Sequence, residues 1–252
     1  MMVLLTRLGL VLVLALSPAL TAHADASDTR AVMVPESGTY SRTISTQSPD
    51  AQKFFDQGLR LAWGFYFPES IASYQQASLF DPDHPMPYWG IAHAAGPNPN
   101  SRYAQMPDDP QGAGLAAIEA ALARIDRATP MEAALIRALY VFYDAVSISD
   151  PGERDRAYLA QMRALNKKYP DDPDVSALYA GSFMSIRRWD YWDKRGQAKG
   201  ETLAVAEALE HVIRKGGVHP GVYHGASMFD GIHARMFVRM YDRVYLVACS
   251  IE

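Results

Sequence analysis

The pattern that most constrains the fold lies between residues 51 and 90. Counted from Ala51, six residues stand where a helical hairpin needs a large, a small, an aromatic or a helix-ending side chain. They are Phe54 at position 4, Gly58 at 8, Ser70 at 20, Tyr74 at 24, Ala77 at 27 and Pro82 at 32. Small residues let two helices cross closely, whereas large ones fill the space between neighbouring pairs. The segment therefore predicts one complete helix pair, ended by Pro82.

The same pattern begins again one period later. A shift of about 34 residues places Tyr88 at position 4, Ile91 at position 7 and Ala92 at position 8. Two residues depart from the pattern, because Gln57 occupies position 7, which is usually apolar, and Leu61 occupies position 11, which is usually aromatic. The two matches in phase favour a repeat array over a single amphipathic hairpin.

These features resemble the tetratricopeptide repeat family, and within it exported bacterial proteins with a YWGIA…GPN segment after the first repeat. The corresponding segments here are Tyr88-Trp89-Gly90-Ile91-Ala92 and Gly96-Pro97-Asn98. The resemblance covers residues 50–222 and implies an all-α, right-handed solenoid of about four helix pairs. Polar stretches near 97–111 and 190–200 are predicted to be insertions. Such a resemblance implies a fold and says little about activity.

The first 24 residues resemble a secretory signal peptide. Arg7 supplies a positive start, an apolar run follows from Leu8 to Leu16, and Ala22-His23-Ala24 predicts cleavage after Ala24. The run is shorter than the roughly 20 apolar residues of a membrane span, which argues against an uncleaved anchor. We expect a periplasmic or secreted bacterial protein without a membrane span after cleavage. Residues 25–49, rich in Ser, Thr, Asp and Pro, predict an extended lead-in to the first helix.

Composition narrows the classes of function. The formal net charge of −4 argues against a nucleic-acid partner, although residues 187–195 mix basic and aromatic side chains. The single cysteine, Cys249, excludes an internal disulfide framework and a cysteine-cluster zinc site. We expect no cofactor.

The resemblance also implies which residues line a concave groove. In this repeat type, positions 2, 5, 9 and 12 of each first helix face the groove. They correspond to Gln52, Phe55, Leu59, Ala62, Met86, Trp89, His93, Gly96, Asp174, Ala177, Gly181 and Met184. We take Phe55, Leu59, Met86, Trp89 and His93 as the candidate ligand groove. Its aromatic and Met character favours a peptide or an apolar ligand. The alternative is that Phe55 and Trp89 belong to the core.

Histidines and acidic turns are the candidate metal ligands of the sequence. His219, His224 and His233 lie close in sequence, but their spacing matches no zinc motif, and we interpret them as turn and surface residues. His84 is interpreted as a turn residue. The acidic segments Asp81-Pro82-Asp83 and Asp171-Asp172-Pro173-Asp174 lack the spacing of a calcium loop and are interpreted as turns that stop and start helices.

Residues 223–252 depart from the family pattern. Residues 241–249 are largely apolar, whereas a solenoid normally ends in a pair with a polar outer face. The segment is either the end of a truncated product or a divergent capping helix with Met236, Met240 and Val244 facing inward. The sequence leaves both alternatives open.

The leading functional hypothesis is an exported, non-catalytic scaffold that binds a protein or peptide in its groove. One alternative is a metal-dependent enzyme or a metal-binding protein on a helical-repeat scaffold, which would use His93 or the late histidines with an acid from an insertion. A further alternative is a structural assembly subunit whose array stacks end to end. No motif predicts a catalytic residue or a metal ligand.

Overall fold

The computed structural model describes residues 31–35, 37–98 and 106–229, and within them the chain is helical. The helices are α1 (Pro49–Trp63), α2 (Phe67–Phe80), α3 (Pro85–Ala95), α4 (Pro110–Leu122), the 3-10 turn η3 (Ile125–Arg127), α5 (Pro130–Tyr143), α6 (Pro151–Lys168), α7 (Pro173–Arg187), α8 (Thr202–Arg214) and α9 (Pro220–Phe229). Within the described residues the only β-type pairing is a single bridge between Trp192 and Ala198. The predicted all-α class is confirmed for this part of the chain. The predicted signal peptide and residues 230–252 lie outside it.

Most of the helices begin with a capping side chain followed directly by proline. The side chains that accept a backbone N–H of the first turn are those of Ser48, His84, Asp109, Thr129, Asp150, Asp172 and His219. Each capping side chain satisfies one of the free N–H groups at a helix start, and proline has no N–H to leave unpaired. The capping side chains and prolines therefore determine where these helices begin, and several of them lie in the acidic and histidine-containing segments predicted to be turns.

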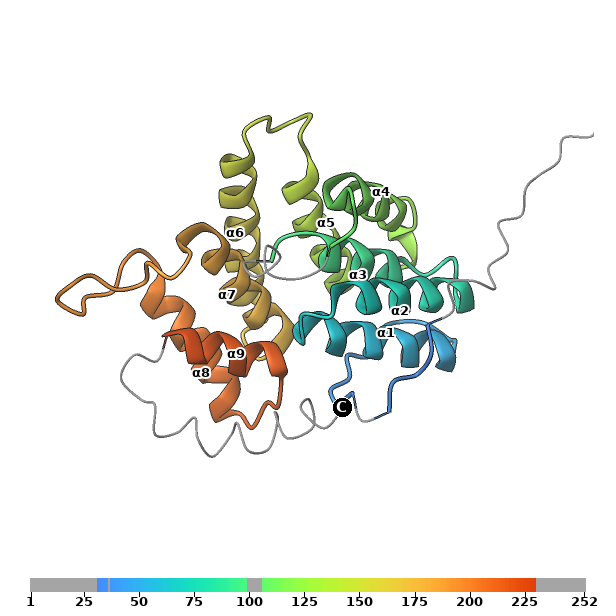
Figure 1. The fold of residues 1–252 in the computed structure, drawn as a ribbon, viewed down its shortest axis with the longest axis horizontal. Coiled ribbons are helices and arrows are strands. Elements are labelled where there is room, and N and C mark those ends of the chain that lie inside the picture. The colour runs from blue at the N-terminus through green and yellow to red at the C-terminus, as the bar shows by residue number, and fades with distance from the viewer. Residues whose placement is uncertain (1–30, 36, 99–105, 230–252) are drawn as a thin grey trace, which may run out of the picture.

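Helices adjacent in sequence pack against each other throughout the described chain, from α1 with α2 to α8 with α9. Contacts between α1 and α3, α3 and α5, and α7 and α9 link alternate helices, and α9 also touches α1. The first and last described helices therefore lie together on one side of the molecule (Figure 1).

The Tyr74 ring explains why the repeat pattern needs small residues. Tyr74 is fully buried in α2, and its ring lies between Gly58 of α1 and Gly90 of α3. A Cβ atom built on Gly58 would lie 2.8 Å from the ring, and one built on Gly90 would lie closer still. The three helices can approach this closely only because both positions lack a side chain.

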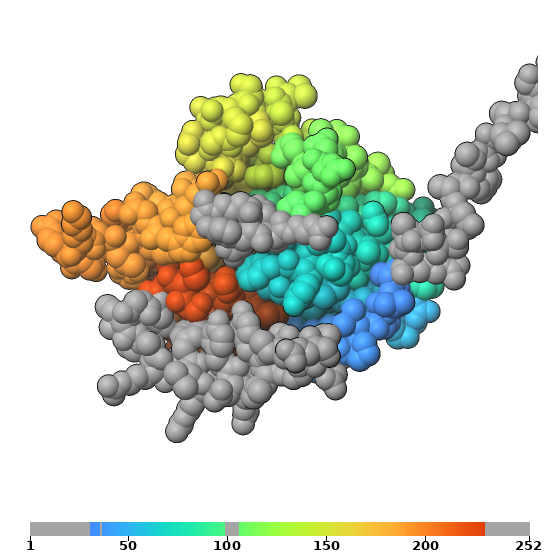
Figure 2. Space-filling view, in the orientation of Figure 1, coloured from blue at the N-terminus to red at the C-terminus, as the bar shows by residue number. Residues whose placement is uncertain are grey.

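Two connections project from the helical body. The segment 144–150 joins α5 to α6, and the segment 188–201, orange in Figure 2, extends away from the neighbouring helices. The second is the predicted insertion near 190–200. Of the predicted insertion near 97–111, residues 106–109 are non-helical, and residues 99–105 lie outside the described chain. Residues 223–229, the described part of the divergent segment, continue α9 and bury Ala226 and Phe229.

No helix in the described part of the chain has both the length and the apolar character needed to cross a bilayer.

Substitution of Gly90 by alanine tests the packing around Tyr74. We expect Gly90→Ala to lower the free energy of unfolding by about 1–3 kcal/mol, because the new methyl group overlaps the buried ring. Gly181→Ala is the matched control, since a Cβ there meets nothing within 4 Å and alanine favours a helix interior. Urea unfolding measures both variants. A Gly90→Ala protein as stable as Gly181→Ala would contradict the packing.

Candidate functional site

The segment before α1 is held against the helices as an extended chain. We call residues 31–48, apart from residue 36, the lead-in. From residue 41 onward its exposure alternates, because Arg42 and Ile44 are covered while Ser41, Thr43 and Ser45 are exposed. A period of two residues is that of an extended strand, in which successive side chains point to opposite sides. One side of the lead-in therefore faces the helices (Figure 1).

Gln57 of α1 binds the backbone of the lead-in with both ends of its side-chain amide. Its Oε1 accepts from the N–H of Val34 at 2.7 Å, and its Nε2 donates to the carbonyl of Val32 at 2.9 Å and to Ser73 Oγ at 3.0 Å. Gln57 is only 1% exposed, so these bonds satisfy a buried polar group. The two bonds to the lead-in involve only backbone atoms, so they do not depend on the lead-in side chains.

Gln52 repeats the same arrangement one turn earlier in α1. Its Oε1 accepts from the N–H of Ile44 and its Nε2 donates to the carbonyl of Arg42, both at 2.9 Å. Next to it, Asp56 accepts from the N–H of Arg42 at 3.0 Å and from Ser41 Oγ at 2.7 Å. Burial raises the pKa of Asp56 above its ordinary value in spite of these hydrogen bonds. The backbone from Ser41 to Ile44 is thus fixed along α1.

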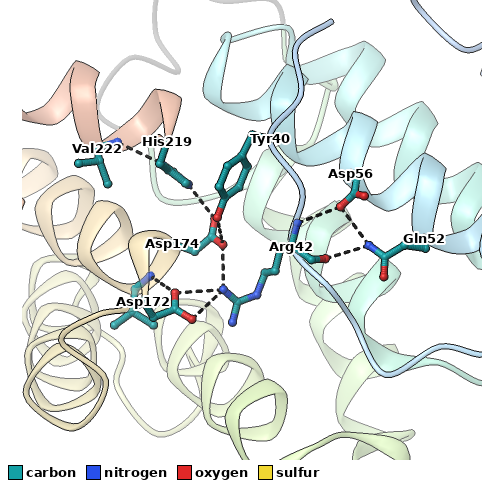
Figure 3. A network of polar contacts seen from close by, with 9 residues as sticks. Tyr40, Arg42, Gln52, Asp56, Asp172, Asp174, His219 and Val222 are labelled. Atoms are coloured by element: carbon teal, nitrogen blue, oxygen red, sulfur yellow. Dashed lines mark hydrogen bonds and ion pairs between the residues drawn. The ribbon is translucent and has the colours of Figure 1, made fainter. Parts of the chain in front are cut away.

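Asp174, in the first turn of α7, is the centre of a buried polar cluster (Figure 3). The Arg42 guanidinium lies 2.8 Å from its Oδ2 and 3.0 Å from Asp172 Oδ1. Tyr40 donates its hydroxyl to Asp174 Oδ2 at 2.7 Å, and His219 Nε2 lies 2.9 Å from Oδ1. Asp174 and His219 are both 0% exposed. The cluster joins the lead-in to α7 and to the start of α9.

The electrostatics of the cluster keep Asp174 ionised. Burial alone would raise the pKa of Asp174, but His219, Arg42 and the Tyr40 hydroxyl hold that pKa well below its ordinary value. His219 Nδ1 accepts from the N–H of Val222 at 3.0 Å, so Nε2 carries the ring proton that is donated to Asp174. Since both ring nitrogens of His219 are occupied, the pair has no nitrogen left to exchange a proton with a substrate.

A second contact lies at the start of α5. Ser45 donates its N–H to Glu132 Oε1 at 2.8 Å and its hydroxyl to Oε2 at 2.7 Å, and Ser45 Oγ accepts from His84 Nε2 at 2.9 Å. Glu132 also accepts from the N–H of Thr129 as part of a capping box. Burial opposes these hydrogen bonds, yet together they hold the pKa of Glu132 below its ordinary value.

The helices present mainly acidic groups to the lead-in. The carboxylates that bond to it are those of Asp56, Asp81, Glu132, Asp172 and Asp174. Arg60 also takes part, donating to the Tyr40 carbonyl at 2.8 Å. A hollow of about 460 Å³ runs along the lead-in from Tyr40 to Ser45, bordered by the starts of α5 and α7. The surface under the lead-in therefore suits a segment that carries positive charge.

The structure places the five candidate groove residues in the core. Phe55, Leu59, Met86, Trp89 and His93 are at most 7% exposed. The reason is that the first helices are covered on this side as well, since α1 packs against α2, α3 and α9. The expectation of an open groove at these positions is corrected accordingly.

Two other residues of the implied groove set, Gln52 and Asp174, do bind an extended segment. Sequence reasoning assigned no binding role to Asp56, Gln57 or Glu132. The polar Gln57 at a normally apolar position was the signal that could have identified the site.

His93 and His219 are buried and His224 is half-buried. His93 stacks on Trp89 with ring centroids 5.2 Å apart, and burial lowers the pKa of His93 to about 4. His219 lies in the turn before α9, as predicted, but is buried, and His224 packs against Phe65, which corrects their interpretation as surface residues. In the described residues, no three His, Cys, Asp or Glu side chains converge to hold a metal ion. His233 lies outside the described chain.

Comparison of the chain with protein-family models, with curated proteins and with solved structures gives no match in any of the three. The contacts between the lead-in and the helices are therefore the basis for a functional proposal.

Asp174→Asn tests the buried cluster. Loss of the charge leaves Arg42 buried without its closest partner, and we expect the free energy of unfolding to fall by about 3–5 kcal/mol. Asp171→Asn, three residues earlier in the same turn, is the control, because its carboxylate is 64% exposed and pairs with surface groups. Urea unfolding should show a clear loss only for Asp174→Asn. Equal losses would argue against the cluster.

The burial of His93 predicts an acid-sensitive contribution to stability. The unfolded chain takes up a proton on this histidine near its ordinary pKa of 6.5, whereas the folded chain does so only near 4. The free energy of unfolding should therefore fall as the pH drops from 6.5 to 4, by roughly 3 kcal/mol from this group. His84 and His224, whose pKa values burial also lowers, act in the same direction.

His93→Leu should flatten this pH dependence in urea unfolding measured at several pH values. His211→Leu, at a partly exposed histidine paired with Asp171, should leave the dependence on His93 in place. The prediction is contradicted if the free energy of unfolding of His93→Leu falls between pH 6.5 and 4 as steeply as that of the wild-type chain. The folded wild-type chain would then protonate His93 as readily as the unfolded chain does.

Proposed function

We propose that this chain is a scaffold of the tetratricopeptide repeat type that binds an extended segment of a protein or peptide at the surface where its own lead-in lies. The observation that carries the proposal is the pair of glutamine contacts. Gln52 and Gln57 each bond the carbonyl and the N–H of two alternate residues in an extended chain. Backbone recognition of this kind gives affinity for any extended peptide.

The helix order supports the repeat interpretation. Helices α1 with α2, α3 with α4, α5 with α6 and α7 with α8 pack as consecutive pairs, and α9 follows as the start of another. The lead-in continues directly into α1. The first helices α3, α5 and α7, and also α9, each begin beside the lead-in, through His84, Glu132, Asp174 and His219. A surface made by equivalent ends of successive helices is the kind that repeat scaffolds use to bind an elongated ligand.

The chemistry of the site supports binding over catalysis. The buried pair of His219 and Asp174 has the appearance of a catalytic dyad, but its hydrogen bonds all go to the chain itself. The acidic side chains of the site fix the side chains and N–H groups of the lead-in, and the two glutamines bind its backbone. We therefore propose a non-catalytic binding protein, exported to the periplasm or secreted, as its first 24 residues suggest.

Selection from a random peptide library tests this function. The test requires a variant whose lead-in binds the helices less tightly while the residues on the helices stay unchanged. Ile44→Ala meets this requirement, because Ile44 is the buried aliphatic side chain of the lead-in, 3% exposed. Random dodecapeptides displayed on phage are selected on this variant, and the enriched peptides are synthesised. We expect them to bind Ile44→Ala at least about tenfold more tightly than the wild-type chain, where the intact lead-in competes.

Thr43→Ala is the matched control, since Thr43 is exposed and its substitution should leave the affinity at the wild-type value. Circular dichroism checks that both variants are folded. Failure to enrich any peptide on a folded Ile44→Ala protein, or equal affinities for all three chains, would refute peptide binding at this surface.

A further inference from the structure

We infer that the lead-in is an exchangeable self-ligand, and that the partner segment which replaces it carries an aromatic residue, an arginine and a β-branched aliphatic residue at alternate positions. This inference rests on the proposed function and adds the chemistry of the partner. It is drawn from Tyr40, Arg42 and Ile44, the three consecutive inward positions of the lead-in.

The arginine position is the most selective of the three. The Arg42 guanidinium bonds to both oxygens of Asp172 and to Asp174, and its side chain is 10% exposed. All of these contacts are made by the single nitrogen Nη1, so this position selects a long cationic side chain, which the lead-in supplies as arginine. An occupant without a cation here would leave the buried carboxylate of Asp174 with fewer partners.

The flanking inward positions select for shape. Tyr40 packs edge-on against His219, with ring centroids 4.3 Å apart, and its hydroxyl reaches Asp174. Ile44 is buried between helices two residues beyond Arg42. A phenol at the first position satisfies an apolar contact and a hydrogen bond together, and a branched aliphatic side chain suits an extended backbone.

The outward position between the arginine and the aliphatic residue leaves the partner free to vary. Thr43 is exposed, and the hollow of about 460 Å³ lies beside it, so a substitution there meets open space. Ser41 is also exposed, but its hydroxyl donates to Asp56 Oδ2 at 2.7 Å, so the position between the aromatic residue and the arginine favours a small hydrogen-bond donor.

Exchange requires only that the lead-in can leave while the helices stay packed. The lead-in joins them at Ser48–Pro49 and is held mainly by hydrogen bonds and one ion cluster, with Ile44 as its fully buried aliphatic side chain. Segments with few buried apolar contacts open at lower free energy than the core. As a tethered ligand the lead-in competes at an effective concentration on the order of millimolar, so a free partner is expected to bind weakly until the lead-in is weakened.

The experiment uses synthetic peptides with the sequence of residues 37–48, SGTYSRTISTQS, labelled with fluorescein. The full mature chain carrying Ile44→Ala is the receptor, and its contacts to a peptide are intact. We expect the matched peptide to bind, a peptide with alanine in place of the arginine to bind at least about tenfold more weakly, and a peptide with alanine in place of the second threonine to bind equally. Equal binding of the arginine-free peptide would overturn the inference.

A second measurement needs no variant. Excess matched peptide added to the wild-type chain should speed hydrogen exchange at the backbone N–H groups of Arg42, Ile44 and Ser45, which donate to Asp56, Gln52 and Glu132. Unchanged exchange at saturating peptide would overturn the inference. So would concentration-dependent dimers that the peptide dissociates, because the occupant would then be a second copy of the chain.

The two proposals fail in different ways. Library peptides that compete with the lead-in but lack the aromatic, arginine and aliphatic pattern would leave peptide binding in place and remove the inferred partner chemistry. Absence of binding by both library peptides and the matched peptide would remove the proposed function as well.

Discussion

The buried carboxylate of Asp174 is the constraint around which distant parts of the chain are arranged. An ionised carboxylate at 0% exposure is costly unless it is paired and hydrogen-bonded. Helix α7 offers it no such partners by itself. They come from Tyr40 and Arg42, more than 130 residues earlier in the chain, and from His219 at the start of α9. The position of α7 is therefore stabilised by α9 and by a segment that brings a phenol and a cation to Asp174, which the lead-in supplies.

The lead-in is held by residues that also start helices. Asp172 accepts from an N–H at the start of α7 and from Arg42. Glu132 forms the capping box of α5 and also accepts the N–H of Ser45. His84 and His219 each accept an N–H through Nδ1 and present Nε2 toward this site. Because one side chain performs both tasks, the positions of the helix starts and the path of the lead-in are coupled. The positive ends of the helix dipoles also favour carboxylates here.

The packing of the helices could be predicted from the sequence to a greater extent than the site. The spacing of Gly58 and Tyr74 predicted a close helix crossing, and the buried ring between two glycines confirms it. The groove residues were chosen from the position numbers of a repeat whose inner face is open. Here His93 packs against Trp63 of α1, and Gly221 of α9 lies against the same Trp63 ring. The contact between α9 and α1 joins residues too far apart in sequence for any local pattern to reveal. The local information about the site lay in the helix-start acids and histidines and in Gln57.

The extended lead-in could not be assigned to a binding surface from its own sequence, because its inward residues differ in polarity. Tyr40, Arg42 and Ile44 share a side of the chain but form no apolar alternation, which is the usual signature of a strand packed on one face. The receptor side carried a clearer signal in Gln57. A buried amide has donors and an acceptor to satisfy, and the backbone of its own helix is already paired. A polar residue at an apolar repeat position therefore predicts that a non-helical segment, with free N–H and carbonyl groups, packs against the array at that point.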